Sequence, residues 1–187
     1  MNYSTARRVA DEILESLAPH CLRIEVKGSV CRVKVDDIHD IEIVCIPKPR
    51  TAPPAFGETP YASPLHAYTD GLLQLGLMAY RKDKNGRRAW GDKFRRALWR
   101  STPLDLFITT AEQWGVIATI RTGSAAFSHK LVTPAVQGGW MPIGMRVELG
   151  RLWHGTMAIE TPEEADFFEA IGLPWVEPIG RNLEVFA

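Results

Sequence analysis

The hydrophobic and polar positions of the chain alternate most clearly just before its first proline-rich stretch. At residues 41–46 apolar side chains recur at every second position, which is the period of a β-strand with one buried face. The same alternation projects Asp40 and Glu42 side by side from the opposite face. Two neighbouring carboxylates repel each other, and a divalent cation with oxygen ligands is the usual reason for such a pair. The pattern therefore predicts a strand that carries chemistry, although the solvent-exposed face of an edge strand would have the same pattern.

A helix and another strand are predicted before this one. Apolar residues recur at helical spacing between residues 9 and 17, with Ser4 or Thr5 as the N-cap and Pro19 as the end of the helix. Residues 22–26 then alternate between apolar and charged side chains, as a strand does.

A short glycine-containing turn joins the two predicted strands. Gly28 and Ser29 form a small pair whose backbone amides suit a phosphate group, and Arg32 is spaced to bind the same group through charge-assisted hydrogen bonds. An exposed β-turn is the alternative interpretation. A phosphate site beside paired carboxylates is typical of nucleotidyl transfer.

The rest of the chain mixes helical and strand patterns, and the whole predicts an α+β fold. Six prolines between residues 47 and 64 indicate an extended surface loop. The later predicted elements are a helix at 65–78, a tight hairpin at Asn85-Gly86, a strand at 104–108, helices at 111–120 and from Ser124 to Pro134, short strands within 145–160, and a last helix capped by Thr161 and ended by Gly172.

Composition narrows the class of protein. The 187 residues are 45% hydrophobic and 24% charged, which is ordinary for a globular protein. No apolar run approaches the roughly 20 residues that cross a bilayer, and Met1 to Leu17 lacks the apolar core of a signal peptide. Three cysteines without close pairing indicate reduced thiols. We therefore expect a cytoplasmic protein that is not bound to a membrane.

The net charge of zero conceals a basic segment. Residues 81–100 contain nine Lys or Arg residues against two Asp, interleaved with three aromatic residues. Such a segment predicts a surface that binds a nucleic-acid backbone, and a solvated hairpin explains it equally well. The predicted DNA-binding residues are Lys84, Arg87, Arg88, Lys93, Arg95 and Arg96.

Several stretches together resemble one known family. The sequence from Gly28-Ser29-x-x-Arg32 to Asp40-x-Glu42 resembles the active-site strand of the polymerase-beta-like nucleotidyltransferases. The segment 104–108, which contains Asp105, resembles the strand that carries that family's third carboxylate. Thr122-Gly123-Ser124 is similar to the Thr-Gly-Ser that binds the nucleotide sugar in family X DNA polymerases, and residues 161–178 resemble the close of their last subdomain.

The resemblance implies a fold and a set of site residues. It implies a nucleotidyltransferase palm at residues 1–110, a mixed sheet with helices on one side, and a small α/β subdomain of the thumb type at 111–187 that binds nucleotide and DNA. It implies two Mg²⁺ ions, for which Mn²⁺ substitutes, held by three carboxylates. It also implies a strained peptide between Gly123 and Ser124. The implied metal ligands and catalytic residues are Asp40, Glu42 and Asp105, and the implied nucleotide-binding residues are Gly28, Ser29, Arg32, Thr122, Gly123 and Ser124.

The chain departs from the family pattern at some of these positions. Glu42 stands where the well-known polymerases carry Asp, and its extra methylene favours Mn²⁺ because Mg²⁺ demands near-ideal geometry. The 28–40 loop is one residue longer than the common spacing, so that Asp36 or Asp37 is an alternative ligand.

The expected function is that of a minimal, monomeric, family-X-like DNA polymerase. It would add nucleotides from nucleoside triphosphates to the 3′-hydroxyl of a DNA primer-template or gapped DNA, in short gap filling or DNA repair. One alternative is a nucleotidyltransferase with another acceptor, an RNA end or a small molecule. The other is a catalytically inactive module that binds nucleic acid.

Overall fold

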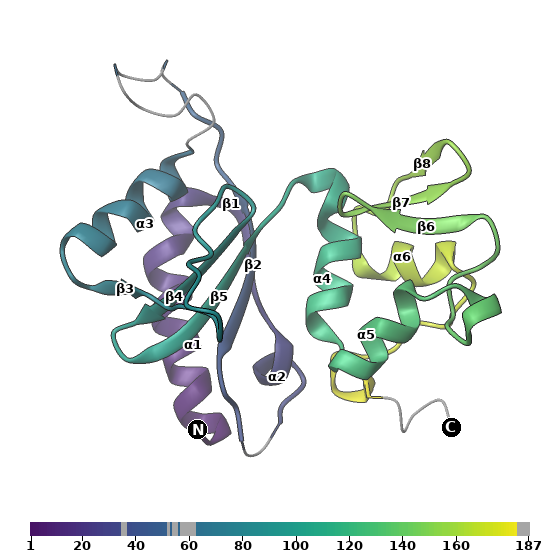
Figure 1. The fold of residues 1–187 in the computed structure, drawn as a ribbon, viewed down its shortest axis with the longest axis horizontal. Coiled ribbons are helices and arrows are strands. Elements are labelled where there is room, and N and C mark those ends of the chain that lie inside the picture. The colour runs from purple at the N-terminus through teal and green to yellow at the C-terminus, as the bar shows by residue number, and fades with distance from the viewer. Residues whose placement is uncertain (35–36, 52, 54–55, 57–62, 183–187) are drawn as a thin grey trace. The chain divides into compact units, whose positions relative to one another are not determined.

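The computed structural model of the protein describes residues 1–34, 37–51, 53, 56 and 63–182 (Figure 1). By its contacts the chain divides into two compact units. The first contains residues 1–26 and 35–109, and the second contains residues 27–34 and 110–187. The short segment 27–34 therefore groups with the carboxyl-terminal part of the chain, although a division at 110–111 was expected. Much of the proline-rich segment at 47–64 lies outside the described residues.

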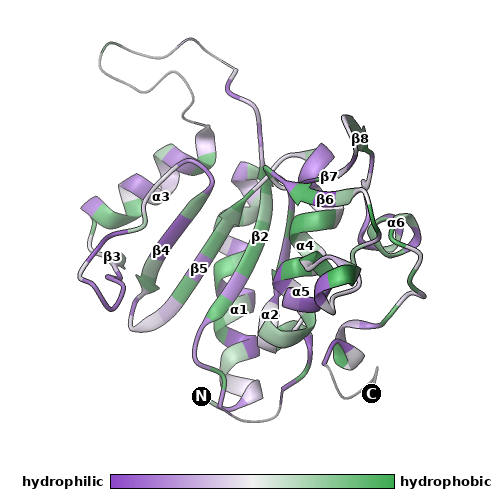
Figure 2. Ribbon diagram, turned by 45° about the vertical axis from the view of Figure 1, so that its right-hand side comes forward, coloured by the Kyte–Doolittle hydropathy of each residue, from purple (hydrophilic) through white to green (hydrophobic). Residues whose placement is uncertain are grey.

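The first unit is built on a five-stranded mixed sheet with the order β1-β2-β5-β4-β3. β2 and β5 are parallel, whereas β4 is antiparallel to both of its neighbours. Figure 2 shows hydrophobic colour over much of β2 and hydrophilic colour in the middle of β4. The strands are β1 (Cys21–Lys27), β2 (Ile41–Pro47), β3 (Met78–Tyr80), β4 (Phe94–Trp99) and β5 (Thr102–Ile108).

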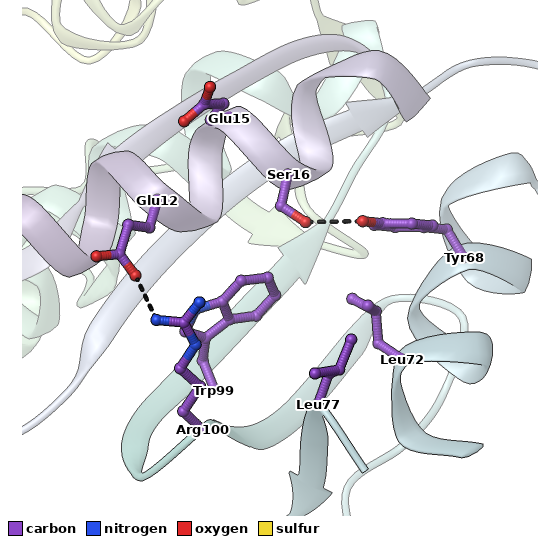
Figure 3. Close-up of a pocket in the computed structure, with 8 residues that line it drawn as sticks. All are labelled: Glu12, Glu15, Ser16, Tyr68, Leu72, Leu77, Trp99 and Arg100. Carbon is purple, nitrogen blue, oxygen red and sulfur yellow. Dashed lines mark hydrogen bonds and ion pairs between the residues drawn. The ribbon is translucent and has the colours of Figure 1, made fainter. Parts of the chain in front are cut away.

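Helices α1 (Tyr3–Leu17) and α3 (Pro64–Gln74) cover one face of this sheet. The Arg95 side chain on β4 donates hydrogen bonds to the His66 carbonyl and the Thr69 hydroxyl of α3, at 3.1 and 2.5 Å. Trp99 lies on the same face of β4, and Figure 3 shows it beside both helices. The expected α+β class, with a mixed sheet and helices on one side, is confirmed.

Two helix boundaries in this unit differ from the prediction. Asn2 caps α1, because its side-chain oxygen accepts a hydrogen bond from the Thr5 amide at 3.0 Å, so neither Ser4 nor Thr5 is the cap. α3 ends at residue 74, four residues earlier than expected. Gly76 adopts a φ of 71° there, which a helix cannot contain, and the chain then enters β3.

The second unit packs helices against a small antiparallel sheet with the order β6-β7-β8. Its core contains Phe127, Leu131, Leu152, Phe167 and Phe168, each at most 1% exposed. The elements are α2 (Gly28–Cys31), α4 (Trp114–Thr122), α5 (Ala125–Val132), β6 (Met145–Glu148), β7 (Arg151–His154), β8 (Met157–Ile159) and α6 (Glu164–Ala170), with 3-10 turns at Ala18–His20 in the first unit and Ala111–Gln113, Ala135–Gln137 and Pro178–Gly180 in the second.

Helix α6 begins later than the sequence predicted. Glu163 is its N-cap, and the Asp166 carboxylate accepts a hydrogen bond from the Glu163 amide at 2.8 Å. Thr161 is therefore not the cap. Its carbonyl instead accepts a hydrogen bond from the Gly115 amide at 3.0 Å. A Cβ at Gly115 would lie 2.3 Å from that carbonyl oxygen, so α4 approaches this segment as closely as only glycine allows.

Among the described residues, no helix combines the length and the apolar composition needed to cross a membrane.

Candidate active site

The three predicted catalytic carboxylates lie on one face of the first unit's sheet. Glu42 on β2 and Asp105 on β5 are direct partners in the parallel register, and partners in a parallel pair point to the same face. Asp40 precedes Glu42 by two residues and therefore shares this face. Helices α1 and α3 cover the opposite face of the sheet. Asp105 pairs with Arg96 on β4, so these two side chains share a face, whereas the adjacent Arg95 points to the other face and contacts α3.

One arginine joins two of these carboxylates. The Nη1 atom of Arg81, just after β3, lies 3.6 Å from Asp40 Oδ2 and 3.6 Å from Asp105 Oδ1. That nitrogen is buried and makes no hydrogen bond within the described residues, so its interaction with both acids is electrostatic. Asp40 and Asp105 are therefore close enough to share a single cation.

A second arginine binds Asp105 through both carboxylate oxygens. Arg96 Nε donates to Oδ1 and Arg96 Nη2 donates to Oδ2, each at 2.9 Å. Hydrogen bonding to Asp105 raises the pKa of Arg96, and the charges of Asp105, Asp40 and Asp83 act in the same direction, while burial opposes them. Asp105 itself is only 5% exposed. The carboxylate that the sequence assigned to metal binding is thus held by a bidentate ion pair.

The donor chemistry of this face fits a divalent cation. Carboxylate oxygens are the ligands that Mg²⁺ and Mn²⁺ take, and the register aligns Glu42 with Asp105. In the described part of the chain, however, no three His, Cys, Asp or Glu groups are already arranged to hold a metal ion. A cation that binds here would have to replace the guanidinium groups on Asp105.

Of the two alternative ligands in the 28–40 loop, the structure describes Asp37, which makes no ion pair with Arg81 or Arg96 among the described contacts. Asp37 is exposed, and its carboxylate lies 3.3 Å from His39 Nε2. Asp36 lies outside the described residues.

In the second unit, the two predicted nucleotide-binding segments are in contact. Arg32 follows the single turn α2, and its Nη1 donates to the Thr122 carbonyl at 2.6 Å. Its Nη2 donates to Ser29 Oγ at 3.3 Å. Gly28 opens this turn with a φ of 65°, a conformation that favours glycine. The geometry therefore brings Ser29, Arg32 and Thr122 together within the second unit.

The Thr122-Gly123-Ser124 segment is an ordinary junction of two helices. The peptide between Gly123 and Ser124 is trans, and Gly123 has a φ of −64°, so the expected strain is wrong. Ser124 caps α5 by accepting from the Phe127 amide at 3.2 Å, and the Thr122 hydroxyl donates to the Ala118 carbonyl at 2.7 Å. A Cβ at Gly123 would lie 2.6 Å from Ser128 Oγ and 2.8 Å from Phe127 Cδ1, so a larger residue there would require these side chains to move.

The basic segment contains side chains that are exposed to solvent and side chains that are paired with acids. Lys84, Arg87, Arg88 and Lys93 are exposed. Arg95 is 5% exposed and bonds Asp70 at 2.7 Å, and Arg96 is bound to Asp105. Four of the six predicted DNA-binding residues therefore present their charge to solvent, while the guanidinium groups of the other two are already occupied by acids.

A pocket of about 470 Å³ lies elsewhere in the first unit, between α1 and α3. In Figure 3 a hydrogen bond joins Ser16 to Tyr68 at 2.9 Å, and an ion pair joins Glu12 to Arg100 at 3.2 Å. None of the predicted catalytic or nucleotide-binding residues lines this pocket.

No protein-family model matches the chain, and a search of curated proteins finds no match.

Proposed function

We propose that this protein is a nucleotidyltransferase of the polymerase-beta-like type. The observation that carries the proposal is the in-register pairing of Glu42 with Asp105, with Asp40 on the same sheet face. An acidic group gathered by neighbouring strands is costly for stability, and two arginines compensate it here. A bound cation would offset the repulsion between these carboxylates, and cation binding would therefore explain why the chain places them together.

More narrowly, we propose a family-X-like DNA polymerase that extends a 3′-hydroxyl on primer-template or gapped DNA. Exposed Lys84, Arg87, Arg88 and Lys93 would bind the DNA backbone. Ser29 and Arg32 would bind the triphosphate, and Gly123 and Ser124 would approach the sugar. In the reaction, the 3′-oxygen forms a bond to the α-phosphorus while the bond to the leaving pyrophosphate breaks.

The roles of the chain's own residues are positioning and charge compensation. Asp40, Glu42 and Asp105 would hold two Mg²⁺ or Mn²⁺ ions, which when bound would lower the pKa of the attacking hydroxyl and neutralise charge on the pyrophosphate. Arg32 would bind phosphate oxygens through its forked guanidinium. To do so it would release the Thr122 carbonyl or Ser29.

We further propose a monomeric cytoplasmic protein that acts in short gap filling or DNA repair. Cys21, Cys31 and Cys45 form no disulfide bond within the described residues, which supports a reducing compartment.

Primer extension on a gapped DNA duplex tests the proposal. The wild-type protein should extend the primer with Mg²⁺ or Mn²⁺, and Asp105→Asn should not. Glu15→Gln, which removes an exposed carboxylate of α1, is the matched control and should extend normally. Absence of extension by folded wild-type protein with either metal would reject the polymerase. Labelled nucleotide transfer to an RNA end in the same conditions would instead establish the alternative acceptor.

A further inference from the structure

Three charged side chains form a buried chain of ion pairs in the second unit. Lys27 is 3% exposed, Glu164 is 9% exposed and Arg181 is fully buried. One oxygen of Glu164 accepts from Lys27 Nζ, and the other accepts from Arg181 Nη1. Buried charges are expensive unless they are paired, and Glu164 is the carboxylate that these two cations share.

The guanidinium of Arg181 makes further contacts in the core. Its guanidinium carbon lies 5.1 Å from the centre of the Phe168 ring and 4.7 Å from that of Trp175. Its Nε donates to the Val176 carbonyl at 2.9 Å. Glu164 is the first residue of α6, where the helix dipole also favours a negative charge.

Each cation is connected to a different predicted nucleotide-binding segment. Lys27 directly precedes Gly28 and Ser29 and is the N-cap of α2. At the other end, the Arg181 carbonyl accepts a hydrogen bond from the Ser124 amide at 3.0 Å. One carboxylate therefore links the turn proposed to hold the triphosphate with the turn proposed to approach the sugar.

We infer that Glu164 is a positioning residue that fixes the spacing between these two segments through Lys27 and Arg181. The inference rests on the proposed function, because it places the triphosphate of the incoming nucleotide at the turn next to Lys27 and the sugar at the turn bonded to Arg181. Loss of the ion pair between Lys27 and Glu164 would leave the Gly28-Ser29 turn less firmly positioned and would weaken its binding of phosphate. The interactions made at the sugar end would persist, since Arg181 and Glu164 remain paired.

The test is an equilibrium titration of the 187-residue protein. The probes are a fluorescent, non-hydrolysable deoxynucleoside triphosphate with Mg²⁺ and inorganic tripolyphosphate as a competitor. The main variant is Lys27→Met, which leaves one cation and one anion paired in the core. Arg146→Met is the control, because Arg146 forms an exposed pair with Glu148 in the same unit. Circular dichroism and thermal melting confirm that each variant is folded at the titration temperature.

Lys27→Met should bind both the triphosphate and tripolyphosphate about tenfold more weakly, while Arg146→Met binds as the wild type does. A purely structural ion pair would lower the melting temperature and leave the affinity of the folded protein unchanged. Wild-type binding with Lys27→Met within twofold of it would overturn the inference and leave the proposed function standing. Absence of triphosphate binding by the wild type would overturn both.

A second variant keeps the test decisive if Lys27→Met does not fold. Glu164→Asp retains the charge but withdraws the carboxylate by one methylene, so that it cannot reach both cations at their present spacing. It should weaken triphosphate binding at least threefold in the folded state. An unchanged affinity would overturn the inference.

Discussion

Glu42 and Asp105 are direct partners across the parallel strands β2 and β5. Like charges opposite each other destabilise a sheet, and the sheet tolerates them because Arg96 and Arg81 approach from β4 and the end of β3. Asp40 and Asp105 are therefore in an ion-paired state. A bound divalent cation would compete with those arginines for the same oxygens.

We expect Asp105→Asn to lower the rate of nucleotide incorporation by at least about 100-fold, or about 2.7 kcal/mol in the barrier. The amide retains the shape of the side chain but loses the charge that would hold a metal ion. Single-turnover primer extension measures the effect, with Glu15→Gln as the control. A loss smaller than about tenfold would contradict the assigned role.

Removal of the guanidinium on Asp105 should strengthen metal binding. We expect Arg96→Gln to lower the Kd for Mn²⁺ about three- to tenfold, because the ion no longer displaces a bidentate partner. The free Mn²⁺ signal in electron paramagnetic resonance measures the Kd. Lys93→Gln removes an equal charge at an exposed position nearby and should change it less than twofold. Weaker binding to Arg96→Gln would mean that Arg96 orients Asp105 for the metal.

The salt dependence of DNA binding should follow the exposed cations. We expect the triple change of Lys84, Arg87 and Lys93 to Gln to weaken binding to duplex DNA and to flatten the plot of log K against log salt. The slope should fall by about 0.9 for each phosphate that the variant no longer neutralises. Fluorescence anisotropy at several salt concentrations measures both effects. An unchanged slope would place the DNA-binding surface elsewhere.

The Asp70 side chain should contribute to the free energy of unfolding. Its Oδ1 accepts from the buried Arg95 at 2.7 Å and from Trp90 Nε1 at 2.8 Å. We expect Asp70→Asn to lower the free energy of unfolding by about 1–2 kcal/mol, because Arg95 loses its counter-charge but keeps its bonds to Thr69 and His66. Urea unfolding measures this change. The salt slope of DNA binding should stay the same, and a flatter slope would show that Arg95 binds DNA.

Two glycines in helices should respond oppositely to alanine. A Cβ added at Gly71 in α3 would have no other atom within 4 Å, so Gly71→Ala should stabilise the protein by about 0.5–1 kcal/mol. Gly115→Ala should destabilise it by more than about 2 kcal/mol, since its Cβ would lie 2.3 Å from two carbonyl oxygens. Thermal melting of both variants tests the packing, and a neutral Gly115→Ala would contradict the close approach of α4.

Patterns local to the chain predicted most of the fold. Alternation identified β1 and β2, and Gly172, which has a φ of 74°, ended α6 as expected. The caps were harder to predict because several polar residues precede each helix. Asn2 and Glu163 became caps through hydrogen bonds that depend on where the helical turn begins, and composition does not determine that point.

The partners of the charged residues could not be predicted from the sequence. Lys27 continues the alternation of charged residues along β1, which does not distinguish it from Arg23 and Glu25, yet it is buried against Glu164, which is 137 residues away. Arg95 and Arg96 are adjacent and were both counted in the basic segment. They point to opposite faces of β4, where one meets α3 and the other meets Asp105. Charge alone does not reveal which side of a strand is covered.

The assignment of residues 27–34 to the second unit has a practical consequence for dissection of the protein. The polypeptide crosses between the units three times, so one proteolytic nick would not release either half. A truncated gene that begins at codon 110 would encode Glu164 and Arg181 without their lysine. An independently folding version of this unit would require the 27–34 peptide to be grafted onto it or supplied in trans.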